Sequence, residues 1–207
     1  MPIEHQRYFT IDEYLAFERD AQEKHEFRDG EIIAMAGGTY DHGQIIVNIL
    51  VGLHAGLKGS RCHVHESNTR VRVMQKAFYC YPDAMVIRGP PQFDEADKGR
   101  QTVTNPRFVV EVLSPSTEGY DRGDQFTRYR DIESFEEYVL ISADKAMVQV
   151  YFRQKDGNWL FTPAAGLEAI ARFHSINVEL PLAEIYAGVE FPPPPPEEAE
   201  IHESDAR

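Results

Sequence analysis

The sequence predicts an α/β fold in which a central mixed β-sheet is flanked by helices, with a hairpin near each end. Three observations lead to this fold class. Segments of helical periodicity alternate with short apolar segments. Two dense apolar segments near the middle are typical of central strands covered on both faces. The order is hairpin, helix, three strands, helix, strand and second hairpin, as expected for helices packed on one mixed sheet.

Length and composition fit one globular domain of a cytoplasmic protein. A chain of 207 residues with 42% hydrophobic residues can bury a sizeable core. No apolar stretch approaches the ~20 residues that span a bilayer, and the N-terminus lacks the pattern of a secretory signal. Cys62 and Cys80 are too few for a disulfide framework and are expected to be buried free thiols. We predict a domain at residues 1–190 and a Pro-rich, acidic, disordered tail at 191–207.

The N-terminal third contains three local signals. The capping box Thr10-Ile-Asp-Glu13 predicts a helix through about Arg19. Asp29-Gly30 predicts a tight hairpin turn. Asp41 is expected to cap the next helix, whose apolar residues recur at helical spacing. These residues are Ile45, Ile46, Ile49, Leu50, Leu53 and Leu57.

The rest of the chain predicts strands, one further long helix and a closing helix. Residues 62–74 alternate as one half-buried strand, with Asn68, Arg70 and Arg72 on one face. Asp156-Gly157 marks the second hairpin. The remaining expected elements are central strands at 78–87 and 107–113, a polar loop at 88–106, a helix at 121–131, strands at 138–142, 147–152 and 158–161, and a short helix at 180–186.

Two acids stand inside segments that should be buried, Asp83 before Ala-Met-Val-Ile and Glu111 within Phe-Val-Val-Glu-Val-Leu. A buried carboxylate is costly unless it is paired, protonated or bound to a metal. If the two strands are neighbours ~4.8 Å apart, both carboxylates can reach one cation at ~2.1–2.5 Å. A structural ion pair with Arg107 or Arg130 is the alternative, and the residues alone leave both open.

The residues around these acids resemble the PD-(D/E)XK nuclease superfamily, and specifically its Uma-two family of restriction endonucleases. The resemblance covers roughly residues 8 to 187 and implies a restriction-endonuclease-like core. The segments that carry it are Pro82-Asp83, Glu111-Val-Leu-Ser-Pro-Ser-Thr117, Lys24-His-Glu-Phe-Arg-Asp-Gly-Glu31, Ala34-Met-Ala-Gly-Gly38, His42, Tyr120-Asp-Arg-Gly-Asp124 and Glu137-Tyr-Val-Leu-Ile141.

The resemblance implies a metal-dependent endonuclease that hydrolyses DNA phosphodiester bonds. Mg²⁺, for which Mn²⁺ can substitute, would be held by Asp83 and Glu111, with the backbone carbonyl of Val112 as a third oxygen. His42 and Glu26 are further polar candidates for the catalytic site. For both, a structural or supporting role is favoured over direct metal ligation.

The chain departs from the family pattern at the lysine that helps to orient water. The superfamily position is Leu113, and the lysine of the family's Asp-Arg-Gly-x-Lys pattern is replaced by Gln125. Glutamine can position water but brings no positive charge. Gln125-Phe-Thr-Arg-Tyr129 is also similar to the Gln-x-x-x-Tyr element of exonuclease-type relatives. The alternative function is therefore a catalytically weak or inactive nuclease-fold module that binds DNA or protein.

The net charge of −13 argues against tight non-specific binding to DNA, which depends on basic surfaces. Residues 192–207 contribute −4 of it, and the rest of the chain carries −9. Acids clustered around metal ions can account for such a charge in a nuclease. A homodimer is expected, because cutting duplex DNA usually takes two active sites and two-fold dimers are the commonest oligomers.

Two sets of side chains allow a second interpretation. Arg70, Arg72 and Lys76 can line a phosphate-binding groove, although exposed charges on an amphipathic strand are the commoner explanation. His63 and His65 on one strand face can bind a transition metal. Without further ligands beside them, a solvated strand face is favoured.

Overall fold

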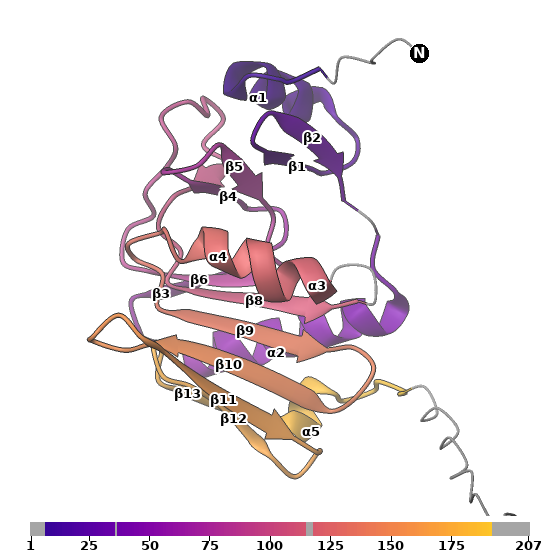
Figure 1. The fold of residues 1–207 in the computed structure, drawn as a ribbon. Coiled ribbons are helices and arrows are strands. Elements are labelled where there is room, and N and C mark those ends of the chain that lie inside the picture. Colours follow the sequence, from indigo (N-terminus) through magenta and orange to yellow (C-terminus); the bar gives the residue numbers. More distant parts are fainter. Residues whose placement is uncertain (1–6, 36, 115–117, 192–207) are drawn as a thin grey trace, which may run out of the picture.

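The computed structural model describes residues 7–35, 37–114 and 118–191 and has a mixed α/β fold, as predicted (Figure 1). The described strands form a six-stranded sheet (β11-β10-β9-β8-β6-β3), a five-stranded sheet (β2-β1-β5-β4-β7) and a two-stranded sheet (β12-β13). In chain order the elements are α1 (Ile11–Asp20), β1 (His25–Arg28), β2 (Glu31–Ala34), α2 (Tyr40–Gly56), β3 (Cys62–Glu66), β4 (Arg70–Val73), β5 (Phe78–Cys80), β6 (Ala84–Arg88), β7 (Thr102–Val103), β8 (Phe108–Leu113), α3 (Glu118–Tyr120), the π-helical turn η1 (Asp121–Gln125), α4 (Phe126–Tyr129), β9 (Glu137–Ser142), β10 (Met147–Arg153), β11 (Trp159–Ala165), β12 (Ile170–Phe173), β13 (Val178–Pro181) and α5 (Leu182–Ile185).

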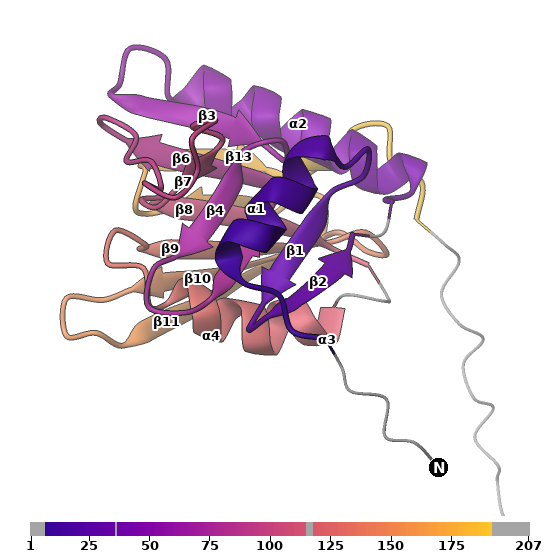
Figure 2. The ribbon, with the colours of Figure 1, turned by 90° about the horizontal axis from the view of Figure 1, so that it is seen from above.

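The larger sheet lies between two layers (Figures 1 and 2). One face packs against α2, α5 and the β12–β13 hairpin through an apolar core that includes Ile49 and Phe173. The other face packs against α4 and the smaller sheet through a second core that includes Val73 and Tyr129. A third, aromatic cluster joins α1 to the smaller sheet. Strand β8 is central to the larger sheet, parallel to β9 and antiparallel to β6.

The predicted N-terminal signals are confirmed. Thr10 and Glu13 exchange both bonds of the capping box at the start of α1. Asp29 and Gly30 have φ of 51° and 99°, the left-handed values that a two-residue hairpin turn requires, and Arg28 pairs with Glu31 across it.

Helix α2 begins two positions earlier than predicted. Its N-cap is Thr39, whose hydroxyl accepts a hydrogen bond from the His42 N–H at 3.2 Å, and Asp41 lies inside the first turn. The prediction that Asp41 caps the helix is therefore wrong. The apolar periodicity is confirmed, because Ile45, Ile49 and Leu53 are fully buried against the sheet.

The two longest predicted strands were wrong in their extent. Residues 62–74 form β3 in the larger sheet and β4 in the smaller one, with Asn68 in the turn between them. Residues 78–87 likewise divide into β5 and β6, because the chain crosses between the sheets at residues 81–83. Pro82 fits this crossing, since it has no N–H to donate to a strand ladder. The crossing brings Asp83 to the start of β6.

The C-terminal part matches the prediction except at the β12–β13 hairpin, at α5 and at β11, which extends through Ala165. Gly157 has φ of 87° in the turn between β10 and β11, as expected. The β12–β13 hairpin was not predicted, and α5 is shorter than the predicted 180–186 helix because β13 extends through Pro181. The loop at 88–106 also contains β7. Apart from Phe191, the predicted tail lies outside the described residues, as do residues 115–117 of the resemblance segment.

Both cysteines are free thiols; Cys80 is buried as predicted, but Cys62 is only half-buried. Within the described ranges, every helix is too short or too polar to cross a lipid bilayer.

Candidate active site

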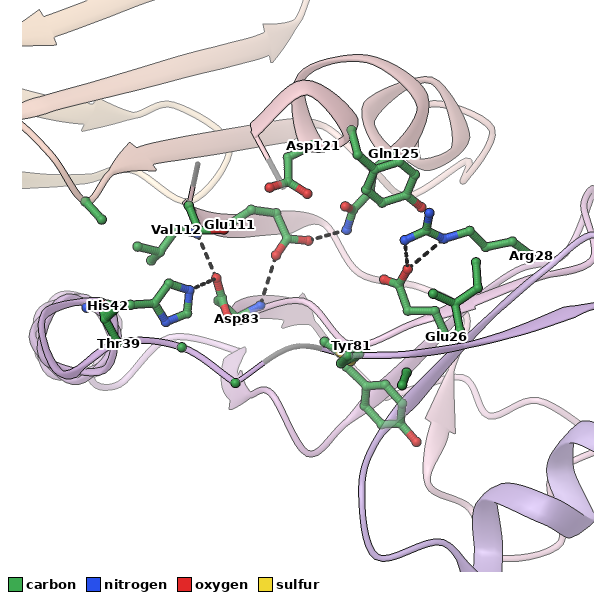
Figure 3. A pocket seen from close by; sticks show the side chains of 18 of the residues that line it. Glu26, Arg28, Thr39, His42, Tyr81, Asp83, Glu111, Val112, Asp121 and Gln125 are labelled. Atoms are coloured by element: carbon green, nitrogen blue, oxygen red, sulfur yellow. Dashed lines mark hydrogen bonds and ion pairs between the residues drawn. The ribbon is translucent and has the colours of Figure 1, made fainter. Parts of the chain in front are cut away.

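Asp83 and Glu111 meet across neighbouring strands of the larger sheet (Figure 3). Asp83 immediately precedes β6, Glu111 lies in β8, and the antiparallel register pairs Ala84 with Val110. The Asp83 N–H donates to Glu111 Oε2 at 3.2 Å, and the Val112 N–H donates to Asp83 Oδ2 at 2.7 Å. Each carboxylate is therefore tied to the strand that carries the other. The geometry confirms that both side chains face one cavity.

This cavity has a volume of about 550 Å³ and lies between the larger sheet, the β1–β2 hairpin and the helical segment after β8. Its charged lining is mostly acidic. The lining acids are Glu26, Asp83, Glu111, Asp121 and Asp144, and the lining basic residues are Arg28 and His42.

Glu111 is a buried acid that forms no ion pair with a Lys, Arg or His of the described residues. Burial raises its pKa well above the ordinary value, and the negative charges of Asp83 and Asp121 raise it further. Arg107 pairs with Glu136, and Arg130 lies over the ring of Phe126, with 5.4 Å from Cζ to the ring centroid. Neither arginine makes the structural ion pair that the sequence left open.

Two neutral side chains hold Glu111 from the helical segment. Gln125 Nε2 donates to Glu111 Oε1 at 2.7 Å, and the Tyr129 hydroxyl donates to the same oxygen at 3.0 Å. Tyr129 also contacts Cys80 Sγ at 3.1 Å. Gln125 thus reaches the cavity as the sequence implied, whereas Tyr129 was not assigned to it. The sequence feature that could have identified Tyr129 is its spacing of four residues from Gln125, which places both side chains on one helix face.

Asp121 is an acid that the sequence analysis did not assign to the site. It is 6% exposed and lines the cavity, where its side chain lies near that of Glu111 (Figure 3). The predicted helix 121–131 begins with the π-helical turn η1, which contains both Asp121 and Gln125. Such turns are rare and often occur at functional sites. The spacing of Asp121 four residues before Gln125 was the signal available in the sequence.

His42 lies at the start of α2, next to Asp83. Its Nε2 is 3.4 Å from Asp83 Oδ2. The hydrogen bond with Asp83 raises the pKa of His42, burial opposes this, and the charge of Asp83 and a backbone hydrogen bond with Val112 add to the increase. The imidazole therefore favours the protonated form and balances part of the charge on Asp83.

Glu26 lines the cavity but is paired with Arg28 rather than with Asp83 or Glu111. It accepts hydrogen bonds from Arg28, through Nε at 2.8 Å and through Nη2. Burial raises the pKa of Glu26, and the charge of Arg28 partly offsets that increase. The structure thus brings together four predicted residues, Asp83, Glu111, Gln125 and His42, and places Glu26 in the same cavity with another partner.

Other predicted features lie away from the cavity. Leu113, at the superfamily's lysine position, is buried in the apolar core that includes Tyr129. Arg70 and Arg72 form ion pairs with buried aspartates, and Lys76 pairs with Asp131 at 2.9 Å. These ion pairs do not support the alternative of a phosphate-binding groove, and the exposed position expected for Arg70 is wrong, because Arg70 is 3% exposed.

The donor set at Asp83 and Glu111 fits Mg²⁺, although no three His, Cys, Asp or Glu residues of the described ranges are arranged to hold a metal ion. Mg²⁺ prefers oxygen ligands and commonly binds through one or two carboxylates, keeping several waters. Burial raises the pKa of Glu111, and repulsion from Asp83 and Asp121 raises it further; a bound cation would stabilise the charged carboxylate against both. His63 and His65 lie on the edge strand β3 and form no such group either.

Comparison with known proteins gives consistent results. Two uncharacterized proteins of Synechocystis sp. (strain ATCC 27184 / PCC 6803 / Kazusa), slr1290 and sll1609, are each 34% identical to this chain. The alignments cover 87% and 83% of this chain and 92% and 96% of those proteins. The crystal structure of a putative nuclease belonging to DUF820 from Anabaena variabilis ATCC 29413 is similar in fold. Its TM-score is 0.69 at 17% identity, over 86% of this chain and 97% of that one.

The model of the Uma2 family, described as "Putative restriction endonuclease", matches residues 11–183. The match spans both sheets and every side chain of the cavity named above. This chain belongs to the Uma2 family.

Proposed function

We propose that this protein is a Mg²⁺-dependent endonuclease that hydrolyses DNA phosphodiester bonds in the cavity at Asp83 and Glu111. One observation carries the proposal: two carboxylates, fixed to adjacent strands, face one cavity whose charged lining is mostly acidic. Family membership supports the reaction class, and the similar fold of a DUF820 protein supports the architecture.

Asp83 and Glu111 would hold the ion, with the Val112 carbonyl as a further oxygen. The chemistry that Mg²⁺ supplies when bound is stabilisation of charge on the scissile phosphate and a lower pKa for the attacking water. Because the strand backbone fixes both carboxylates, little ordering is needed when the ion and the substrate arrive.

The surrounding side chains keep the two carboxylates in place. Gln125 and Tyr129 hold Glu111 Oε1, and His42 lies against Asp83 Oδ2. We assign Gln125 and His42 to positioning these carboxylates. We assign Glu26 a supporting role in the cavity wall, where it forms an ion pair with Arg28.

Substitution of either carboxylate tests the proposal. Asp83→Asn and Glu111→Gln should abolish cleavage of plasmid and single-stranded DNA in Mg²⁺ or Mn²⁺, and should remove the calorimetric signal of Mg²⁺ binding. Glu179→Gln is the matched control, because Glu179 is an exposed acid paired with Arg172 on the β12–β13 hairpin. Cleavage at the wild-type rate by either cavity variant would refute the assignment.

A second candidate function is a non-catalytic module that binds DNA or protein. The observation that favours it is the absence of lysine from the described lining of the cavity, since Leu113 is buried elsewhere and Gln125 is neutral. Such a module needs no divalent ion. Calorimetry showing no Mg²⁺ or Mn²⁺ binding at the Asp83–Glu111 pair would favour it over the endonuclease.

A homodimer belongs to the same proposal. Each chain supplies one Asp83–Glu111 pair, so cutting both strands of a duplex in one event requires a second copy. Light scattering at the concentrations used for cleavage should give the mass of a dimer. A monomeric mass would restrict the proposal to cutting one strand at a time.

A further inference from the structure

Arg28 is the feature of the cavity that the proposed chemistry does not use. It lies two residues from Glu26 in β1, so both side chains project from the same face of the strand. Nε donates to Glu26 Oε2 at 2.8 Å, and the guanidinium lies 3.6 Å from the centroid of the Tyr120 ring. The acid and the ring together restrict this long side chain to one position.

The charge balance of the cavity makes this position unusual. Arg28 is the only Lys or Arg among the described residues that line the cavity, where it is accompanied by five acids. Those acids repel a phosphodiester backbone, which carries one negative charge per nucleotide. A strand that enters the cavity therefore gains most from a cation that the fold itself supplies.

Neutralisation of Glu26 alone does not account for the placement of Arg28. The Glu26 side chain is 7% exposed, whereas that of Arg28 is 27% exposed, so part of the guanidinium remains accessible. Arg28 donates to Glu26 through Nε and Nη2. An arginine has five N–H donors, and those directed away from Glu26 stay free for a second anion. In the same wall, the buried Tyr120 hydroxyl has no hydrogen-bond partner among the described residues.

The arrangement of the cavity indicates which anion this is. Figure 3 shows Asp83 and His42 at one end, Glu111 and Gln125 in the middle, and Arg28 with Glu26 at the other end. A strand whose scissile phosphate lies at the carboxylates continues past Gln125 toward Arg28. We infer that Arg28 forms a subsite that binds a backbone phosphate flanking the scissile one. This inference rests on the proposed function and specifies how the substrate strand is held.

The physical basis is a preformed, charge-assisted hydrogen bond. The planar guanidinium matches the geometry of phosphate oxygens better than an ammonium does. Because Glu26 and Tyr120 already order the side chain, binding costs less conformational entropy than it would at a free arginine. The subsite therefore contributes affinity and register, while Asp83 and Glu111 carry the chemistry.

DNA binding measured without divalent metal tests the subsite separately from cleavage. Fluorescence anisotropy of a labelled single-stranded oligonucleotide, in EDTA over a series of KCl concentrations, gives affinity and its salt dependence. Loss of one phosphate contact lowers the slope of log K against log[salt] by about 0.7 for single strands. We expect Arg28→Gln to weaken binding about tenfold, which corresponds to ~1.4 kcal/mol, and to lower the slope by that amount. Arg28→Lys should retain most of the slope and lose part of the affinity.

Arg172→Gln is the matched control, because Arg172 also bonds a glutamate through Nε, at 3.0 Å, but lies outside the cavity. It should leave affinity and slope at wild-type values. If Arg28→Gln alone fails to fold, the double variant Glu26→Gln with Arg28→Gln removes both charges of the buried pair, which proteins tolerate far better than one unpaired charge. The double variant should show the same loss of slope.

A neutral linkage locates the contact on the substrate. An oligonucleotide with one methylphosphonate beside the cleaved bond should bind wild type more weakly, and Arg28→Gln should be insensitive to the change. Wild-type affinity and slope in the Arg28 variants, with normal cleavage by the wild-type protein, would overturn the subsite alone. If the wild-type protein binds no DNA in EDTA or in Mg²⁺, the proposed function fails together with the subsite.

Discussion

The protein buries acids in two contrasting ways. In the smaller sheet, Asp97 Oδ2 accepts hydrogen bonds from Arg70 Nη2 at 3.1 Å and from the Thr102 hydroxyl at 2.7 Å. Burial raises the pKa of Asp97, but the Thr102 hydrogen bond and the charge of Arg70 outweigh it, so the pKa lies below the ordinary value. Asp94 is matched in the same way, by Arg72 and Tyr79.

The cavity in the larger sheet has the opposite character. Glu111 is equally buried, but the nearest charges are Asp83 and Asp121, and its pKa lies well above the ordinary value. Its hydrogen-bond partners are the neutral groups of Gln125, Tyr129 and the Asp83 backbone. Arginines pair with the buried aspartates of the smaller sheet, whereas no Lys or Arg of the described residues forms an ion pair with Glu111, which is the pattern expected of a site that binds a cation.

Removal of Arg70, which pairs with buried Asp97 in the smaller sheet, should have the largest effect on stability. Arg70→Met leaves Asp97 buried without its charge partner, which costs about 3–5 kcal/mol of unfolding free energy. Urea unfolding measures this loss. The control is Arg172→Met, which breaks an exposed ion pair and should cost less than about 1 kcal/mol. Equal effects of the two substitutions would show that the matched cluster contributes nothing beyond a surface pair.

Binding of Mg²⁺ at the Asp83–Glu111 pair should stabilise the fold. An ion that binds the native state alone raises the unfolding free energy by about 2.7 kcal/mol at one hundred times its dissociation constant. We expect Mg²⁺ to raise the melting temperature of the wild-type protein and of Glu179→Gln. Glu111→Gln should show no Mg²⁺-dependent shift. A shift of wild-type size in that variant would place the ion elsewhere.

The same substitution should have opposite signs at two buried glutamates on neighbouring strands. Glu137 in β9 accepts hydrogen bonds from the N–H groups of His174 and Ser175 and from the Ser175 hydroxyl. Glu137→Gln sets an amide donor against those donors and should cost about 1–3 kcal/mol. Without metal at neutral pH, Glu111→Gln should instead raise the melting temperature, because it removes a poorly matched charge.

The pH dependence follows from the raised pKa of Glu111. Its contribution is fully present below about pH 4.3, the pKa of an unfolded glutamate, and is lost as pH rises through the folded value. Metal-free wild type should therefore lose stability relative to Glu111→Gln over that range. Parallel curves of unfolding free energy against pH for the two proteins would contradict the prediction that ionised Glu111 destabilises the metal-free fold.

The sequence predicted the features of the fold and of the site that depend on local signals. The capping box at Thr10, the Asp29-Gly30 turn and the two acids in apolar segments each involve a few neighbouring residues. It failed where one alternating pattern continues through a change of sheet, as at Asn68 and at residues 81–83. Periodicity reports which face is buried, not which sheet a strand joins.

The sequence predicted part of the site but did not assign Asp121 or Arg28 to it. Asp83, Glu111 and Gln125 follow from buried charge and from the family pattern. Asp121 reaches the cavity through a π-helical turn, which has no clear sequence signature. Arg28 reaches it because the β1–β2 hairpin of the smaller sheet forms part of the cavity wall, an arrangement that no single segment encodes.

The last prediction concerns Gln125, where this chain departs from the family pattern. Gln125 is 4% exposed and donates to Glu111 Oε1 at 2.7 Å, so a longer cationic side chain there meets the same carboxylate. We expect Gln125→Lys to raise Mg²⁺-dependent cleavage about tenfold, equivalent to ~1.4 kcal/mol of barrier, because an ammonium at this buried position stabilises developing negative charge more than it would in water.

A second measurement separates this effect from a simple change in packing. The ammonium should also lower the pKa of Glu111, so metal-free Gln125→Lys should lose less stability than wild type as pH rises. Gln125→Met, of similar length and neutral, serves as the control: it removes the hydrogen bond to Glu111 and should neither raise cleavage nor reduce the loss of stability as pH rises. An unchanged cleavage rate in a lysine variant with the altered pH dependence would mean that the charge reaches Glu111 but not the reacting phosphate. The helical segment would then position the carboxylate without replacing the missing lysine.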